Sequence, residues 1–88
     1  MTKTEQLRRG LIAHGAQRVE ARTSKYEVFT IELASTTRKP DGTIVDCMSR
    51  WHLFLGRSAS LRIGREASPA KSIPVSSNFY QTILLKGA

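Results

Sequence analysis

The chain has 88 residues, enough for one domain, and a domain of this size buries only about 60 to 65% of the surface that its unfolded chain exposes. A hydrophobic fraction of 40% then supports one sheet covered by helices on one face, and it leaves too little volume for the deep pocket of a large-substrate enzyme. Fourteen Lys and Arg against seven Asp and Glu give a net charge of +7, which favours an anionic partner such as nucleic acid, an acidic protein or a membrane surface.

The first element in chain order is a helix, which we expect from about residue 3 to residue 14. Thr2 and Glu5 have the spacing of a capping box, and Gly15 stands where a left-handed residue ends a helix. Leu7 and Leu11 share one face of it. The N-terminal residues contain no apolar segment of the signal-peptide kind, and no run is long enough to cross a membrane. We therefore expect a cytoplasmic protein with no membrane partner.

Two strands follow, both with the two-residue alternation of a sheet that has one face in water. The first covers residues 17–22, and a turn at 23–25 separates it from the second, which covers 26–35. The second strand places Phe29, Ile31 and Leu33 on one side, which we assign to the core.

A hairpin connection is predicted at residues 38–42, because Pro40 presets φ, Asp41 bonds nearby backbone and Gly42 supplies a left-handed position. The return strand covers 43–55, and this unusual length predicts a bulge or bend near Ser49. It contains Cys47, the one cysteine of the sequence, so no internal disulfide can form. We interpret this residue as a small buried hydrophobe.

Residues 53–60 and 61–68, LFLGRSAS and LRIGREAS, repeat one another, but two units are fewer than a repeat architecture needs. We interpret the pair as a strand end, a tight turn at 57–60 and a short strand at 61–64. A Ser-, Ala- and Pro-rich loop follows over 66–75.

A closing helix is predicted from residue 77 to residue 86, with Ser76 or Ser77 as its N-cap and Gly87 at its end. The predicted fold is α+β in two layers over residues 1–88, an antiparallel three- to four-stranded sheet flanked by an N-terminal and a C-terminal helix. The expected core consists of Leu7, Leu11, Phe29, Ile31, Leu33, Trp51, Leu53, Ile83 and Leu84.

The sequence gives little support for a metal site, a phosphate-binding loop or a catalytic site. His14 and His52 lie far apart and a single cysteine is present, so we expect no metal site. Gly56 and Gly64 are not followed by the Lys of a phosphate-cradling loop. A ribonuclease that uses His52 has no motif to fix its geometry. We therefore expect no enzyme, no cofactor and no small-molecule substrate.

The segment from residue 50 to residue 71 is strongly basic, with one acidic residue, Glu66. Four of its five cations are Arg, which suits bidentate contact with phosphate. The alternative is that they are solvated surface residues, since basic residues also occur elsewhere, at Lys3, Arg8, Arg9, Arg18 and Arg22. The predicted nucleic-acid-binding residues are Arg50, Arg57, Arg62, Arg65 and Lys71.

Aromatic side chains suggest a second surface. Tyr26, His52 and Phe54 share the sheet face opposite the expected helices, where they could stack on single-stranded nucleic acid or contact a protein, including a second copy of this chain.

Two resemblances bear on function. The helix, strand, strand, strand, helix order is similar to double-stranded-RNA-binding-like domains, including HicA-type toxins that cleave messenger RNA. Those toxins carry a Gly-Ser-His stretch at the start of a strand, where this chain has TSKY at 23–26, so the resemblance extends to topology and not to cleavage. The stretches KYEVF (25–29), FLGRSASLRIGR (54–65) and SIPV (72–75) resemble small proteins encoded by bacteriophages and prophages.

The phage resemblance implies a bacterial cytoplasm and an accessory role. With the charge, it predicts a small basic protein that contacts the phosphate backbone of DNA or RNA. The alternative is a protein-interaction module, either a phage inhibitor of a host protein or a self-associating dimer.

Overall fold

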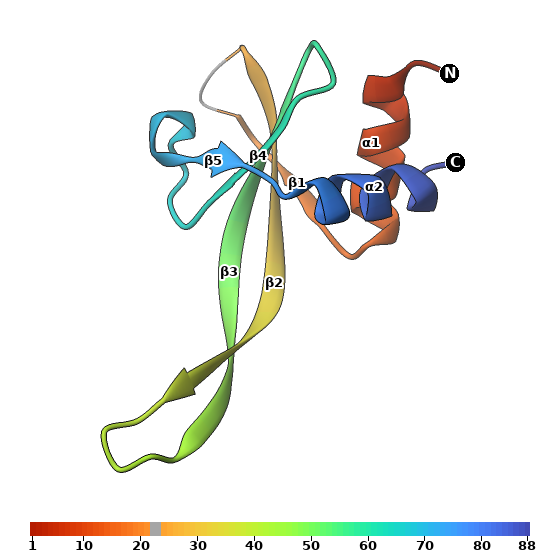
Figure 1. Ribbon diagram of the computed structural model, residues 1–88. Coiled ribbons are helices and arrows are strands. Elements are labelled where there is room, and N and C mark those ends of the chain that lie inside the picture. The colour runs from red at the N-terminus through yellow and green to blue at the C-terminus, as the bar shows by residue number, and fades with distance from the viewer. Residues whose placement is uncertain (22–23) are drawn as a thin grey trace.

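The computed structural model describes residues 1–21 and 24–88. Its strands form one open antiparallel sheet in the order β1-β2-β3-β4-β5, with a helix at each end of the chain (Figure 1). The predicted α+β fold is confirmed. The elements are α1 (Lys3–Ala13), β1 (Gln17–Val19), β2 (Tyr26–Arg38), β3 (Ile44–Gly56), β4 (Leu61–Gly64), the 3-10 turn η1 (Pro69–Lys71), β5 (Ile73–Pro74) and α2 (Ser77–Lys86).

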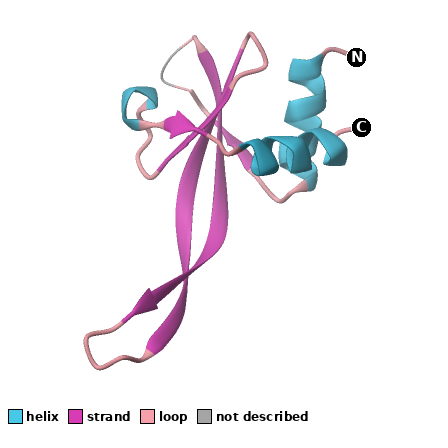
Figure 2. Cartoon of the chain, viewed as in Figure 1, coloured by secondary structure: helices cyan, strands magenta, loops and turns pink. Residues whose placement is uncertain are grey.

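Local signals place both helices where the sequence predicts them. The Thr2 hydroxyl accepts a hydrogen bond from the Glu5 amide at 3.1 Å, and the Ser76 hydroxyl accepts one from the Phe79 amide at 3.2 Å. Gly15 follows α1 with a φ of 100°. The two helices lie together beside one end of the sheet (Figure 2).

The core forms where the helices meet the sheet. Of the nine predicted core residues, Leu33, Trp51 and Leu84 are only partly buried, although they pack against the core. Leu55 and Leu61 were not expected there, and they are buried because they continue the inward faces of β3 and β4. The buried cluster consists of Leu7, Leu11, Ala16, Phe29, Ile31, Leu53, Leu55, Leu61 and Ile83.

Two glycines permit the close contact between α1 and α2. A Cβ atom at Gly10 would overlap the Ile83 carbonyl oxygen, and one at Gly87 would overlap the Gln6 carbonyl oxygen. The Gln6 side chain also donates to the Leu84 carbonyl at 2.7 Å. Gly10 weakens α1 as an isolated helix, and the absence of a side chain there lets the two backbones touch.

The pairing of β2 with β3 runs without interruption from Tyr26 opposite Gly56 to Arg38 opposite Ile44. Of the bulge or bend predicted near Ser49, the bulge is wrong, because every residue in that region has its own partner. β1 reaches β2 only as far as Thr30, and β4 reaches β3 only as far as His52. Residues 31–51 therefore form a two-stranded arm, whose base at Ile31 and Trp51 still contacts the core and whose remainder extends away from the helices, so that the molecule is 50 Å long (Figure 1).

The arm corrects the interpretation of Cys47, which is exposed and not buried. Alternation places it on the same side as Leu53, but no helix reaches that part of the ribbon. Its Sγ lies 3.2 Å from the Ser35 hydroxyl, and hydrogen bonds from Ser35 and Thr37 lower the pKa of this thiol.

Three segment boundaries also differ from expectation. β2 continues to Arg38, beyond its predicted end at residue 35. β1 ends at Val19, whereas the predicted strand continued to Arg22. Arg22, and Thr23 of the predicted turn, lie outside the described residues. The predicted 66–75 loop contains η1 and the short strand β5, which pairs with β4. Periodicity could not find β5, because it has only two residues and one of them is Pro74.

The helix contact predicts that Gly10→Ala lowers the free energy of unfolding by about 1 to 3 kcal/mol, although alanine is the better helix former by about 1 kcal/mol. The added methyl group must push α2 away from α1. Chemical denaturation of both forms measures the change, and Arg9→Ala, on an exposed position beside it, serves as the near-neutral control. A Gly10→Ala protein more stable than the unmodified chain would contradict the close helix contact.

Candidate functional site

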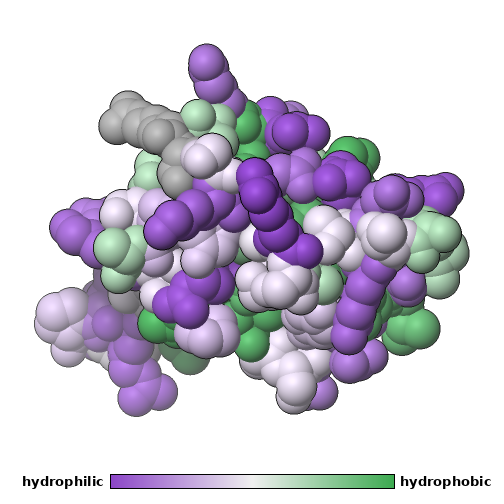
Figure 3. Space-filling view, turned by 90° about the horizontal axis from the view of Figure 1, so that it is seen from above, coloured by the Kyte–Doolittle hydropathy of each residue, from purple (hydrophilic) through white to green (hydrophobic). Residues whose placement is uncertain are grey.

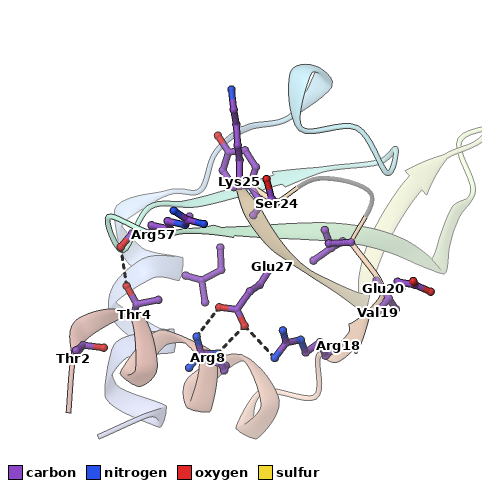
Figure 4. A pocket seen from close by; sticks show the side chains of 15 residues that line it. Thr2, Thr4, Arg8, Arg18, Val19, Glu20, Ser24, Lys25, Glu27 and Arg57 are labelled. Atoms are coloured by element: carbon purple, nitrogen blue, oxygen red, sulfur yellow. Dashed lines mark hydrogen bonds and ion pairs between the residues drawn. The ribbon is translucent and has the colours of Figure 1, made fainter.

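A cleft of about 690 Å³ (Figure 4) opens between segments that lie at the opposite end of the molecule from the tip of the arm (Figure 1). Its walls come from the N-terminal half of α1, from β1, from the start of β2 and from the β3–β4 turn. Figure 3 looks onto this end, and hydrophilic side chains cover most of the face. Four cations from these separate segments line the cleft, which we call the basic cleft: Arg8, Arg18, Lys25 and Arg57.

Glu27 organises one wall of the basic cleft. Arg8 donates to both of its carboxylate oxygens, at 2.8 Å from Nε and 2.6 Å from Nη2, and Arg18 Nη1 lies 3.1 Å from Oε1. The hydrogen bonds from Arg8, with the nearby positive charges, hold the pKa of Glu27 below its ordinary value, and they raise the pKa of Arg8. The cluster keeps one net positive charge and ties α1 and β1 to β2.

Arg57 belongs to a turn that is anchored on both sides. The Thr4 hydroxyl donates to the Arg57 carbonyl at 3.3 Å, and the Tyr80 hydroxyl donates to the Ala59 carbonyl at 2.6 Å. Ala59 adopts a φ of 59°, which lets the chain close the turn. The Arg57 side chain is exposed and reaches across the basic cleft (Figure 4).

The lining of the basic cleft is positive overall. Its four cations face two acids, Glu20 and Glu27, so the difference of four and two leaves a charge of +2. Hydroxyl groups of Thr2, Thr4 and Ser24 also line it. A second hollow of about 350 Å³ shares Lys25 and Arg57 with the cleft and extends it along the molecular surface.

The five basic residues predicted as one patch do not all line the basic cleft. Arg57 lies at one end of β4, in the basic cleft, and Arg65 lies just beyond the other end. Arg62 is turned inward, where its Nε donates to the Ser72 hydroxyl at 2.9 Å and its Nη2 donates to the Ser72 carbonyl at 2.6 Å. That guanidinium fastens the chain after η1 to β4.

The remaining members of the predicted patch have partners of their own. Lys71 lies 3.0 Å from Glu66, and Arg50 lies 3.5 Å from Glu32. The Arg65 guanidinium lies 4.9 Å from the centre of the Trp51 ring, a cation–π contact. Arg57 is thus the member of that set that the structure places in the basic cleft.

The predicted aromatic surface needs a correction at Phe54, which is completely buried. It stands between Val28 and Arg62 in the register, and the Tyr26 ring meets it edge-on at 6.1 Å. These neighbours cover the ring, so it is not available for stacking on a base. Tyr26 and His52 are half-buried.

Sequence reasoning missed Arg8, Arg18 and Lys25 as members of one site. Arg18 stands on the polar side of an alternating stretch, and Arg8 follows the buried Leu7. Neither position identifies its partner, because Glu27 brings the two together only after the helix has packed on the sheet. Among the described residues, no three His, Cys, Asp or Glu side chains gather as metal ligands, and no helix is long and apolar enough to cross a membrane.

Comparisons with known proteins return nothing similar: no protein family, no curated protein and no solved structure matches this chain. The function of this chain is therefore inferred from the geometry of the cleft.

The Glu27 cluster predicts a specific pH dependence. A carboxyl group whose pKa is lower in the folded protein stabilises the fold above its ordinary pKa, about 4.3, and this stabilisation is lost as the pH falls through the lower, folded value. At pH 7 we expect Glu27→Gln to lower the free energy of unfolding by about 1 kcal/mol, and the difference from the unmodified chain to shrink in acid.

Denaturant unfolding at a series of pH values measures this difference. Glu32→Gln is the matched control, because its carboxylate is exposed and its contact with Arg50 is long at 3.5 Å. Equal losses for the two variants across the pH range would contradict the role given to Glu27.

Proposed function

We propose that this chain binds the phosphate backbone of a nucleic acid, DNA or RNA, through the basic cleft. The observation that carries the proposal is the convergence of Arg8, Arg18, Lys25 and Arg57 from four segments on one open cleft. A charge of +2 across its lining favours an anion, and the +7 of the whole chain raises the local concentration of polyanions.

The members of the cleft would contribute in different ways. Arg57 presents an exposed guanidinium fork, which matches the oxygens of a phosphate. Arg8 is held by Glu27. It therefore positions the wall of the cleft and adds to its positive potential, and it stays bonded to Glu27 when phosphate binds. Hydroxyls of Thr2 and Ser24 are further donors to phosphate or sugar.

Such contacts position a protein on a nucleic acid without identifying its bases. The burial of Phe54 removes one of the three rings from the expected stacking surface, which further favours backbone contact over base contact. We therefore propose weak binding that is largely independent of sequence and sensitive to salt.

A protein-interaction module is the second candidate function, and the arm favours it. Residues 31–51 contain three acids and three cations, so the arm is neutral in a chain of charge +7. Ile44 and Met48 on the arm are each 62% exposed, as expected for a surface that meets another protein.

Titration of fluorescent duplex DNA and single-stranded RNA at several salt concentrations tests the proposal. Three or four phosphate contacts predict a slope of about −3 for log K against log salt on duplex DNA. Replacing Lys25 and Arg57 together by Gln should flatten that slope by about 2, and circular dichroism checks that the variant is folded.

The control pair is Arg38→Gln with Lys39→Gln, which removes the same charge from the tip of the arm. We expect that pair to change the slope much less. Equal losses for the two pairs would mean that diffuse charge attracts the polyanion, and no salt-dependent binding at micromolar concentrations would leave the protein-interaction candidate in its place.

A further inference from the structure

Two further hollows continue the basic cleft along the β3–β4 turn, and the three together form one path. The second hollow, of about 350 Å³, shares Lys25 and Arg57 with the cleft. A third hollow, of about 430 Å³, shares Ser60 with the second. Tyr26 lines all three hollows. A ligand larger than a single phosphate therefore has room to extend from the cleft past Tyr26 into the third hollow.

Positive charge falls along this path. The lining of the basic cleft has a charge of +2, and Lys25 and Arg57 supply the charge of the second hollow, whose described lining residues include no acid. In Figure 4 the Lys25 side chain points away from the ion pair of Arg8 with Glu27. The cation that lines the third hollow is Arg62, whose guanidinium already donates to the Ser72 hydroxyl and carbonyl. The path thus presents available cations at one end only.

The third hollow, which we call the apolar hollow, lies between β4, β5 and the first half of α2. Leu61, Pro74 and Val75 give it apolar walls. Ser77 and Gln81, both exposed, add hydrogen-bonding groups. Apolar walls with a few polar groups suit a nucleobase, because a base has two flat apolar faces and a polar edge.

Tyr26 is the aromatic residue at which the charged and the apolar parts of the path meet. Its ring lies over Gly56, its partner in β3, where an added Cβ atom would stand 3.4 Å from the ring carbon Cε1. The ring also meets Phe54 edge-on, with the ring centres 6.1 Å apart. These contacts hold the half-buried ring in place, so little freedom is lost when a base stacks on it.

We infer that an unpaired nucleotide binds along this path, with its phosphate at Lys25 and Arg57 and its base in the apolar hollow against the Tyr26 ring. The inference rests on the proposed function and deepens it by naming single-stranded nucleic acid as the ligand. A base in a duplex is stacked and paired, so it cannot enter the hollow. Stacking on one ring accepts every base, because each has a π-face, and binding therefore remains independent of sequence.

Two strands of equal charge separate the contribution of the base from that of the phosphate. One is a short oligothymidylate, and the other has the same length and backbone with an abasic site in place of every base. We expect the unmodified chain to bind the oligothymidylate about 5- to 100-fold more tightly, the effect of one stacked base. Fluorescence anisotropy at a fixed salt concentration measures both affinities.

Replacing the ring tests its part directly. Tyr26→Leu keeps an apolar side chain over Gly56, and it should weaken the binding of oligothymidylate and of oligouridylate by about 5- to 100-fold. Binding of the abasic strand and of duplex DNA should not change, and neither should the slope of log K against log salt. Tyr26→Phe keeps the ring and should retain the full affinity.

The matched control is His52→Leu. His52 is the other half-buried ring of the predicted aromatic surface, and it is not among the residues that line the three hollows. We expect this variant to bind every strand as the unmodified chain does. Circular dichroism checks that all three variants are folded.

A loss confined to Tyr26→Leu and to the single strands that carry bases would support the inference. Equal affinities of the unmodified chain for oligothymidylate and the abasic strand would overturn it and leave phosphate binding in the basic cleft standing. Equal weakening of every ligand by Tyr26→Leu would overturn it as well, because the ring would then support the cleft without meeting a base. Absence of salt-dependent binding to any strand would overturn the proposed function and this inference with it.

Discussion

The unbroken ladder between β2 and β3 is the interaction on which the rest of the structure depends. Its thirteen pairs set a single alternation along both strands, so Phe29 and Leu53 face the helices together. The same ladder continues past the last residue of β1 and the last pair of β4. One continuous pair of strands thereby forms the floor of the core at one end and an uncovered arm at the other.

This division separates two surfaces of different character. At the core end, α1 packs against α2 through Gly10 and brings Arg8 to Glu27, which places the basic cleft beside the β3–β4 turn. At the far end the ribbon is neutral and exposes Met48. Because the ladder holds the ends apart, a polyanion in the cleft and a protein on the arm could be bound without competing for space.

The fold was largely predictable because its signals are local. Capping at Thr2 and Ser76, the turn residues around Gly42 and the alternation around Phe29 each depend on a few neighbouring residues, and the structure confirms them. The candidate site was not predictable to the same degree. Its cations come from segments distant in sequence, and Arg62, which looked equivalent to Arg57, is bonded to Ser72 inside the fold.

The sequence by itself determined the two helices, the first four strands and their order, the positive charge and the inward face of each long strand, since these follow from residue spacing and composition. Only the tertiary structure decided how far the helices cover the sheet. That extent explains why Cys47 is exposed although it shares the inward parity of Leu53. Phe54 is buried on the opposite face because its neighbours Tyr26, Val28 and Arg62 cover it. Alternation tells which side of a strand a residue occupies, but burial depends on what packs there, and this is set by contacts between distant segments.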